Sequence, residues 1–130
     1  MGQALRHDGS AAALGAARIL LVEDSFFILM ELEAALLEAG AAEVCVCRTV
    51  REAMSTLETQ PVSVAILDIQ LDRESGVEVA RKLARERIPF LFYTGQLDIH
   101  PVHTEWPDCR VISKPATREA IVAAVADLLH

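Results

Sequence analysis

The stretch ILLVEDSFFILMELEAALLEAG, residues 19–40, carries the pattern that decides the fold. Residues 19–22 form a short apolar run rich in β-branched side chains, as is typical of a buried strand. Residues 25–39 have the length and composition of a helix, and Gly40 ends them. The stretch therefore predicts a buried strand that leads directly into a helix.

The same alternation continues along the rest of the chain. It predicts further strands at 43–47, 64–67, 90–93 and 110–112, and further helices at 50–58, 76–87 and 116–129. Because Pro101 and Pro107 fall in the segment 95–109, the fourth helix is expected to be shortened or degenerate. Repeated strand–helix units favour a doubly wound α/β fold, in which helices cover both faces of a five-stranded parallel sheet.

The composition describes one folded, acidic domain. The chain has 130 residues, of which 52% are hydrophobic, so it is too apolar for a disordered protein. It carries 12 Lys and Arg against 19 Asp and Glu, a net charge of −7, and no basic block. Binding to nucleic acid depends on neutralising phosphates, so this charge argues against a nucleic-acid partner.

Residues 1–17 are small and polar, and we expect them to form an N-terminal tail ahead of a domain at 18–130. They lack the long apolar core of a signal peptide, and no apolar run in the chain is long enough to span a membrane. The three cysteines give no even disulfide framework. We therefore expect a cytoplasmic protein.

Three acids, one hydroxyl and one amine stand where predicted strands end. They are Glu23, Asp24, Asp68, Thr94 and Lys114. Open α/β sheets bind their ligands at the carboxyl ends of the strands, so these groups should share one rim. Clustered carboxylates without His or Cys suit Mg²⁺, and a carboxylate beside Mg²⁺ can attack a phosphoryl group. The amine and the hydroxyl would then hold the phosphoryl oxygens.

These residues, in this order, resemble the receiver domain of bacterial two-component response regulators. The resemblance covers residues 18–129 and rests on the motifs ILLVED (19–24), ILDIQL (66–71), SGVEVA (75–80), FYTG (92–95) and SKP (113–115). It implies a flavodoxin-like (βα)₅ fold with strand order 2-1-3-4-5. It also implies a single-domain response regulator that signals by protein contact, and not an enzyme beyond its own phosphorylation and dephosphorylation.

The resemblance assigns a role to each site residue. Asp68 would accept a phosphoryl group from a histidine kinase or a phosphotransfer protein, and Thr94 and Lys114 would contact that group. The Mg²⁺ ion would be bound by the side chains of Asp24 and Asp68 and the backbone carbonyl of Gln70, with Glu23 acting through water. The side chains of Gln70 and Gln96 either tune the lifetime of the phosphate or are solvent-facing amides, and both readings stay open.

Two features depart from most receivers. Val111 stands where receivers usually carry Tyr or Phe, whose rotation reports phosphorylation, so we expect the segment 95–109 to move instead. The sequence PFLFYTGQL at 89–97 resembles the FAT GUY branch of receivers, with Tyr93 in place of Ala and Leu97 in place of Tyr. That branch is frequent among single-domain regulators.

Rival functions are a pseudo-receiver scaffold that is not phosphorylated and a Mg²⁺-dependent phosphohydrolase. The complete acidic set speaks against the scaffold. Haloacid-dehalogenase-like and toprim-like enzymes require the motif Asp-X-Asp. In this chain Gln70 stands in place of the second Asp. A flavodoxin-like cofactor binder is disfavoured because no phosphate-cradling loop follows the first strand.

Two helices offer candidate interfaces. In receivers the first helix docks on the kinase, a role that an exposed Phe26 or Met30 would suit. The last helix is apolar nearly all round at 120–126, which predicts a partner or a homodimer interface there. Its candidate residues are Ile121, Val122 and Val125.

Overall fold

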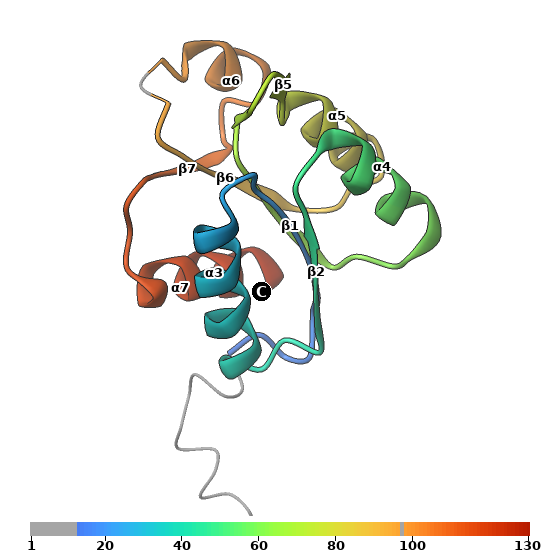
Figure 1. Ribbon diagram of the computed structural model, residues 1–130, viewed down its shortest axis with the longest axis vertical. Helices are drawn as coiled ribbons and strands as arrows, with labels where there is room; N and C mark the ends of the chain where they lie inside the picture. The colour runs from blue at the N-terminus through green and yellow to red at the C-terminus, as the bar shows by residue number, and fades with distance from the viewer. Residues whose placement is uncertain (1–12, 97) are drawn as a thin grey trace, which may run out of the picture.

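The computed structural model describes residues 13–96 and 98–130, and its centre is a five-stranded sheet (Figure 1). The strands are β1 (Arg18–Val22), β2 (Glu43–Cys47), β3 (Val64–Leu67), β6 (Phe90–Thr94) and β7 (Arg110–Ser113). They lie in the order β2-β1-β3-β6-β7, and each neighbouring pair is parallel. This is the predicted 2-1-3-4-5 winding, so the predicted fold class is confirmed.

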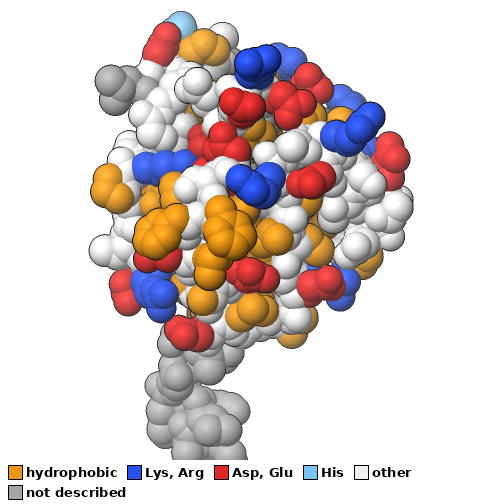
Figure 2. All heavy atoms as spheres, viewed as in Figure 1, with side chains coloured by type: hydrophobic (Ala, Val, Ile, Leu, Met, Phe, Trp, Pro, Cys, Tyr) orange, Lys and Arg blue, Asp and Glu red, His pale blue; other side chains and the backbone are white. Residues whose placement is uncertain are grey.

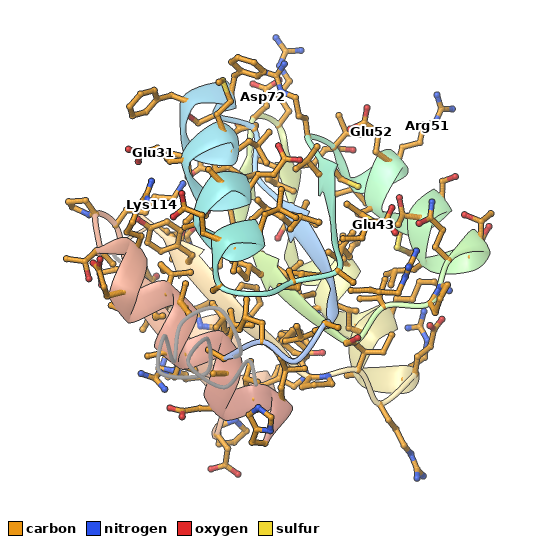
Figure 3. All side chains as sticks on the ribbon, turned by 90° about the horizontal axis from the view of Figure 1, so that it is seen from below. Glu31, Glu43, Arg51, Glu52, Asp72 and Lys114 are labelled. Atoms are coloured by element: carbon orange, nitrogen blue, oxygen red, sulfur yellow. The ribbon has the colours of Figure 1, made fainter. Side chains whose placement is uncertain are left out.

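Helices cover both faces of this sheet. They are α3 (Phe26–Glu38), α4 (Val50–Thr59), α5 (Val77–Arg85), α6 (His100–Glu105) and α7 (Arg118–Leu129). Figures 1 and 3 show α3 and α7 on one face, with α4 and α5 on the other. The predicted shortening of the fourth helix is confirmed, because α6 has only six residues, with a proline in its first turn. None of the described helices is long and apolar enough to cross a membrane.

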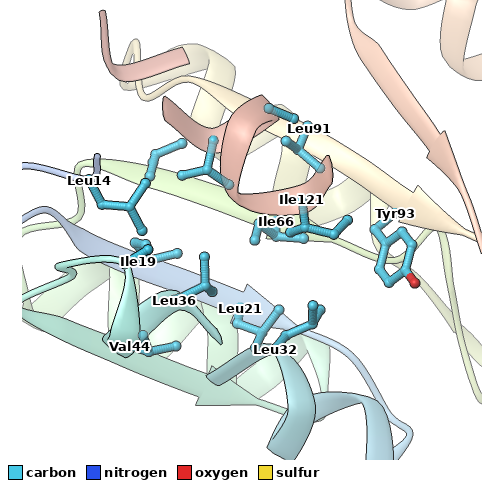
Figure 4. Close-up of a cluster of buried hydrophobic side chains, with 14 of the residues drawn as sticks. Leu14, Ile19, Leu21, Leu32, Leu36, Val44, Ile66, Leu91, Tyr93 and Ile121 are labelled. Carbon is cyan, nitrogen blue, oxygen red and sulfur yellow. The ribbon is translucent and has the colours of Figure 1, made fainter. Parts of the chain in front are cut away.

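Alternating side chains of the strands build two hydrophobic layers. Ile19, Leu21 and Ile66 pack with α3 and α7 on one face (Figure 4), whereas Leu20 and Leu67 pack with α4 and α5 on the other. Period-two alternation in a sheet covered on both sides makes every residue of a central strand apolar. Packing on both faces fixes the strand ends, and this fixes the positions of the polar residues that follow them.

The interface predicted on α7 is wrong for two of its three residues. Ile121 and Val125 are fully buried against the sheet (Figure 4 labels Ile121), and only Val122 is half-buried. Alanines on every side of this helix give it an apolar sequence. Its large branched side chains nevertheless lie on one face, and that face is buried in the core. Any interface on α7 would therefore have to use Val122 and small alanine side chains.

Two local features were not foreseen. Residues 70–75, where the sequence pattern predicts no strand, form an antiparallel hairpin of β4 (Gln70–Leu71) and β5 (Glu74–Ser75). Leu14, which falls in the predicted tail, is buried in the core, and its N–H donates to the carbonyl of Ala39 at 3.2 Å. The first twelve residues of that tail lie outside the described part of the chain, so a domain boundary at residue 18 stays a prediction.

Candidate functional site

The site lies at the carboxyl ends of four strands. Glu23 and Asp24 follow β1, Asp68 follows β3, Thr94 ends β6, and Lys114 follows β7. The parallel register of the sheet brings these ends to one rim, as predicted. The structure thus gathers all five residues, although they are spread over most of the sequence.

Three carboxylates form the centre of the site. One oxygen from each of Glu23, Asp24 and Asp68 lies within 4.8 Å of the others. Glu23 and Asp68 are buried, whereas Asp24 is half-buried. Carboxylates this close repel one another, and burial strengthens the repulsion because water no longer screens it. Such a cluster needs positive charge to remain ionised.

Lys114 supplies part of that charge. Its Nζ lies 2.6 Å from Glu23 Oε1 and 2.8 Å from Asp68 Oδ2. Although burial lowers the pKa of Lys114, hydrogen bonds to Asp68 and Glu23 outweigh it and raise this pKa above the usual value. Burial raises the pKa of Glu23, and the hydrogen bonds from Lys114 and from the N–H of Ser25 offset only part of that rise. One lysine therefore does not neutralise the whole cluster.

The pocket above the three carboxylates has the ligands and the charge that suit Mg²⁺. An open pocket of about 450 Å³ lies over the carboxylates and is lined by Asp24, Asp68, Gln70, Asp72, Thr94, Gly95, Gln96 and Lys114. Carboxylate and carbonyl oxygens in an open pocket suit Mg²⁺, because this ion prefers oxygen ligands and keeps several of its own waters. The excess negative charge and the oxygen donors together match a hard divalent cation.

Thr94 brings a hydroxyl to the same pocket. The side chain is 2% exposed, and its Oγ1 accepts a hydrogen bond from the N–H of Gln96 at 3.1 Å. Because the hydroxyl is used as an acceptor there, its own hydrogen is free to donate to a ligand in the pocket. The side-chain amide of Gln96 donates to the carbonyl of Asp98 at 2.8 Å.

The hairpin of β4 and β5 forms a wall of the site that the sequence pattern did not reveal. The N–H of Asp72 donates to Asp24 Oδ2 at 2.8 Å, and the N–H of Gln70 donates to Asp68 Oδ1 at 3.2 Å. Glu74 Oε1 in turn accepts the N–H of Val50 at the start of α4, at 3.1 Å. Backbone donors from this hairpin therefore orient two carboxylates, and no residue type in the sequence signals that.

The other singled-out residues lie outside the pocket. Val111 is half-buried against the layer of α4 and α5, and it has no ring to rotate. Phe26 and Met30 are exposed, at 61% and 54%, together with Phe27 at 69%. Figure 2 shows bulky hydrophobic side chains gathered over the N-terminal end of α3, the end that follows the acid pair.

Comparisons with known proteins agree with this geometry. The family model described as response regulator receiver domain matches residues 19–126. The solution structure of SdrG from Sphingomonas melonis Fr1 is 37% identical, with a TM-score of 0.75, and the match covers 92% of this chain and 99% of that one. The crystal structure of a response regulator receiver protein from Sinorhizobium medicae WSM419 is 28% identical, with a TM-score of 0.78 and coverages of 89% and 96%.

A longer protein also matches. The anti-anti-sigma factor PhyR from Bartonella quintana is 25% identical, with a TM-score of 0.71, and the match covers 88% of this chain but 47% of that one. No curated relative matches the chain.

Proposed function

Because this chain belongs to the response regulator receiver domain family of two-component signalling, we propose that Asp68 accepts a phosphoryl group from a histidine kinase or a phosphotransfer protein. One observation carries the proposal. The buried carboxylate of Asp68 lies 2.8 Å from the ammonium of Lys114 and within 4.8 Å of Glu23 and Asp24 at the mouth of an open pocket.

The proposal assigns a role to each residue of the site. Asp24, Asp68 and the backbone carbonyl of Gln70 would hold Mg²⁺, which supplies charge that stabilises the phosphoryl oxygens. Both oxygens of Glu23 already have partners, Lys114 at 2.6 Å and the N–H of Ser25 at 3.0 Å. This supports a role for Glu23 through water rather than as a direct ligand.

The transfer itself needs little more than positioning. An oxygen of Asp68 attacks the phosphorus of a phosphohistidine, an O–P bond forms, the P–N bond breaks, and the leaving imidazole takes up a proton. Lys114 and the hydroxyl of Thr94 would hold the phosphoryl oxygens. The chain acts on its own Asp68 in this proposal and not on an external substrate.

Two finer assignments are part of the proposal. The exposed Phe26 and Met30 lie on the helix that follows Glu23 and Asp24, so a kinase seated on them would face Asp68. The short α6 and Val111 support membership of the FAT GUY branch, while Leu97 lies outside the described residues. A signal from this surface would pass by protein contact.

Mass spectrometry after incubation with acetyl phosphate and Mg²⁺ tests the proposal. We expect the mass to rise by one phosphoryl group, and Asp68→Asn to abolish the rise. Asp127→Asn is the matched control, because this exposed acid lies on α7 and does not line the pocket, so its loss should leave phosphorylation intact. An unmodified wild-type chain would favour the pseudo-receiver scaffold, and turnover of an external phosphate ester would favour the phosphohydrolase.

A further inference from the structure

Tyr93 and Thr94, which end β6, hold the turn Lys114-Pro115-Ala116 at three points. The N–H of Lys114 donates to the carbonyl of Thr94 at 2.9 Å. The Nζ of Lys114 lies over the ring of Tyr93, 5.7 Å from its centroid. The N–H of Ala116 donates to the hydroxyl of Tyr93 at 3.1 Å. The turn that carries the ammonium of Lys114 is therefore held in place by contacts with the end of β6.

The Tyr93 ring is a fixed support. The residue is 6% exposed and packs in the hydrophobic layer between the sheet and helices α3 and α7. Figure 4 shows the ring at the end of that layer, with its hydroxyl directed away from the other labelled side chains. The core thus sets the position of the ring, which presents its face to the ammonium of Lys114 and its hydroxyl to the N–H of Ala116.

We propose that Tyr93 is a positioning residue for Lys114, holding its ammonium where Asp68 and an incoming phosphoryl group need it. A lysine has a flexible four-carbon stem, and fixing it costs rotamer entropy at the moment of binding. A cation lying within about 6 Å of a ring centroid is attracted to the ring face, so the stem is ordered beforehand. The inference rests on the proposed function in that Lys114 is taken to contact the phosphoryl group.

Two ligands separate this role from a purely structural one. Mg²⁺ alone binds the carboxylates, whereas beryllofluoride with Mg²⁺ forms a phosphoryl mimic on Asp68 that also needs Lys114. In Tyr93→Leu we expect beryllofluoride to bind roughly 3- to 30-fold more weakly, the range of a lost cation–ring contact. Mg²⁺ affinity, read from the backbone amide resonances of Gln70 and Asp72, should not weaken. Tyr93→Phe keeps the ring and should restore beryllofluoride binding.

Phe92→Leu is the matched control, since Phe92 is the neighbouring buried aromatic residue on the opposite face of the sheet. This variant should be less stable than wild type, but its affinity for beryllofluoride should fall no more than its affinity for Mg²⁺. Equal weakening of both ligands in Tyr93→Leu, or no weakening of either, would overturn the inference.

A signal in the free protein keeps this test separate from the proposed function. The ring of Tyr93 should shift the ε-methylene protons of Lys114 upfield, a shift kept in Tyr93→Phe and lost in Tyr93→Leu. If wild-type protein took up no beryllofluoride, the proposed function would fail, and the positioning role would be judged on this shift. A Lys114 signal that is the same in wild type and Tyr93→Leu would then refute it.

Discussion

A β-carbon placed on Gly76 would stand 1.9 Å from the backbone carbonyl oxygen of Asp68. Real β-carbons essentially never approach so closely, so any other residue at this position must displace backbone at the site. The N–H of Gly76 also donates to the carbonyl of Ile69 at 2.8 Å, which holds the two segments together. The start of α5 and the acceptor loop are thus packed with no room for a side chain.

We therefore expect Gly76→Ala to destabilise the fold by about 1–3 kcal/mol, the usual effect of overpacking. Urea unfolding gives the measurement, and Mg²⁺ affinity should fall with it because the Asp68 loop moves. Gly95→Ala is the control, since a β-carbon at Gly95 meets nothing within 4 Å. Equal stability of the two variants would contradict the packing argument.

Lys114→Met should separate neutralisation from folding. The change leaves Glu23 and Asp68 buried without their cation, which we expect to cost about 1–3 kcal/mol in Mg²⁺-free buffer. Mg²⁺ should bind this variant more tightly than wild type, because a positive charge beside Asp68 has gone. Thermal unfolding with and without Mg²⁺ measures both effects.

Lys82→Met provides the comparison for that experiment. Lys82 on α5 pairs with Glu86, the residue that follows this helix, at 2.8 Å and away from the pocket, so its loss should leave Mg²⁺ affinity unchanged. A similar Mg²⁺ response in both lysine variants would argue against direct neutralisation of the carboxylates by Lys114.

The thiol of Cys109 should react slowly at neutral pH. Burial raises the pKa of Cys109 from 9.0 to about 11. Only the thiolate reacts, and a raised pKa leaves less thiolate below that value. The rate of alkylation by iodoacetamide should therefore climb with pH until about 11 in the folded protein, and level off near 9 in urea. Peptide mass spectrometry resolves this cysteine, and identical pH profiles in the two states would contradict the burial effect.

Trp106 should report phosphorylation in place of the aromatic residue missing at Val111. Its ring lies 5.6 Å from that of Phe90 in an edge contact and 6.1 Å from that of Phe92. It directly follows α6, within the segment 95–109 that we expect to move, and it is the only tryptophan in the chain. Beryllofluoride with Mg²⁺ should change its fluorescence in wild type but not in Asp68→Asn. Amide exchange altered around Asp68 alone, with 98–109 unchanged, would count against this movement.

Much of the fold could be predicted because its signals are local. The strand boundaries at 43–47 and 64–67 match the structure residue for residue, since β-branched runs and flanking turns mark them. The hairpin at 70–75 was missed because two-residue strands carry no periodicity. The burial of Ile121 and Val125 was misread because alanines hide which stripe of α7 faces the sheet.

The sequence by itself determined the succession of the main strands and helices along the chain. It also determined which five polar residues stand at the strand ends. These follow from patterning within single elements and from the rule that parallel strands share a carboxyl edge. Only the tertiary structure decided how those groups interact: Lys114 between Glu23 and Asp68, the N–H of Asp72 on Asp24, and the ring of Tyr93 under Lys114. These contacts join residues from different strands and loops, so their distances exist only once the sheet is assembled.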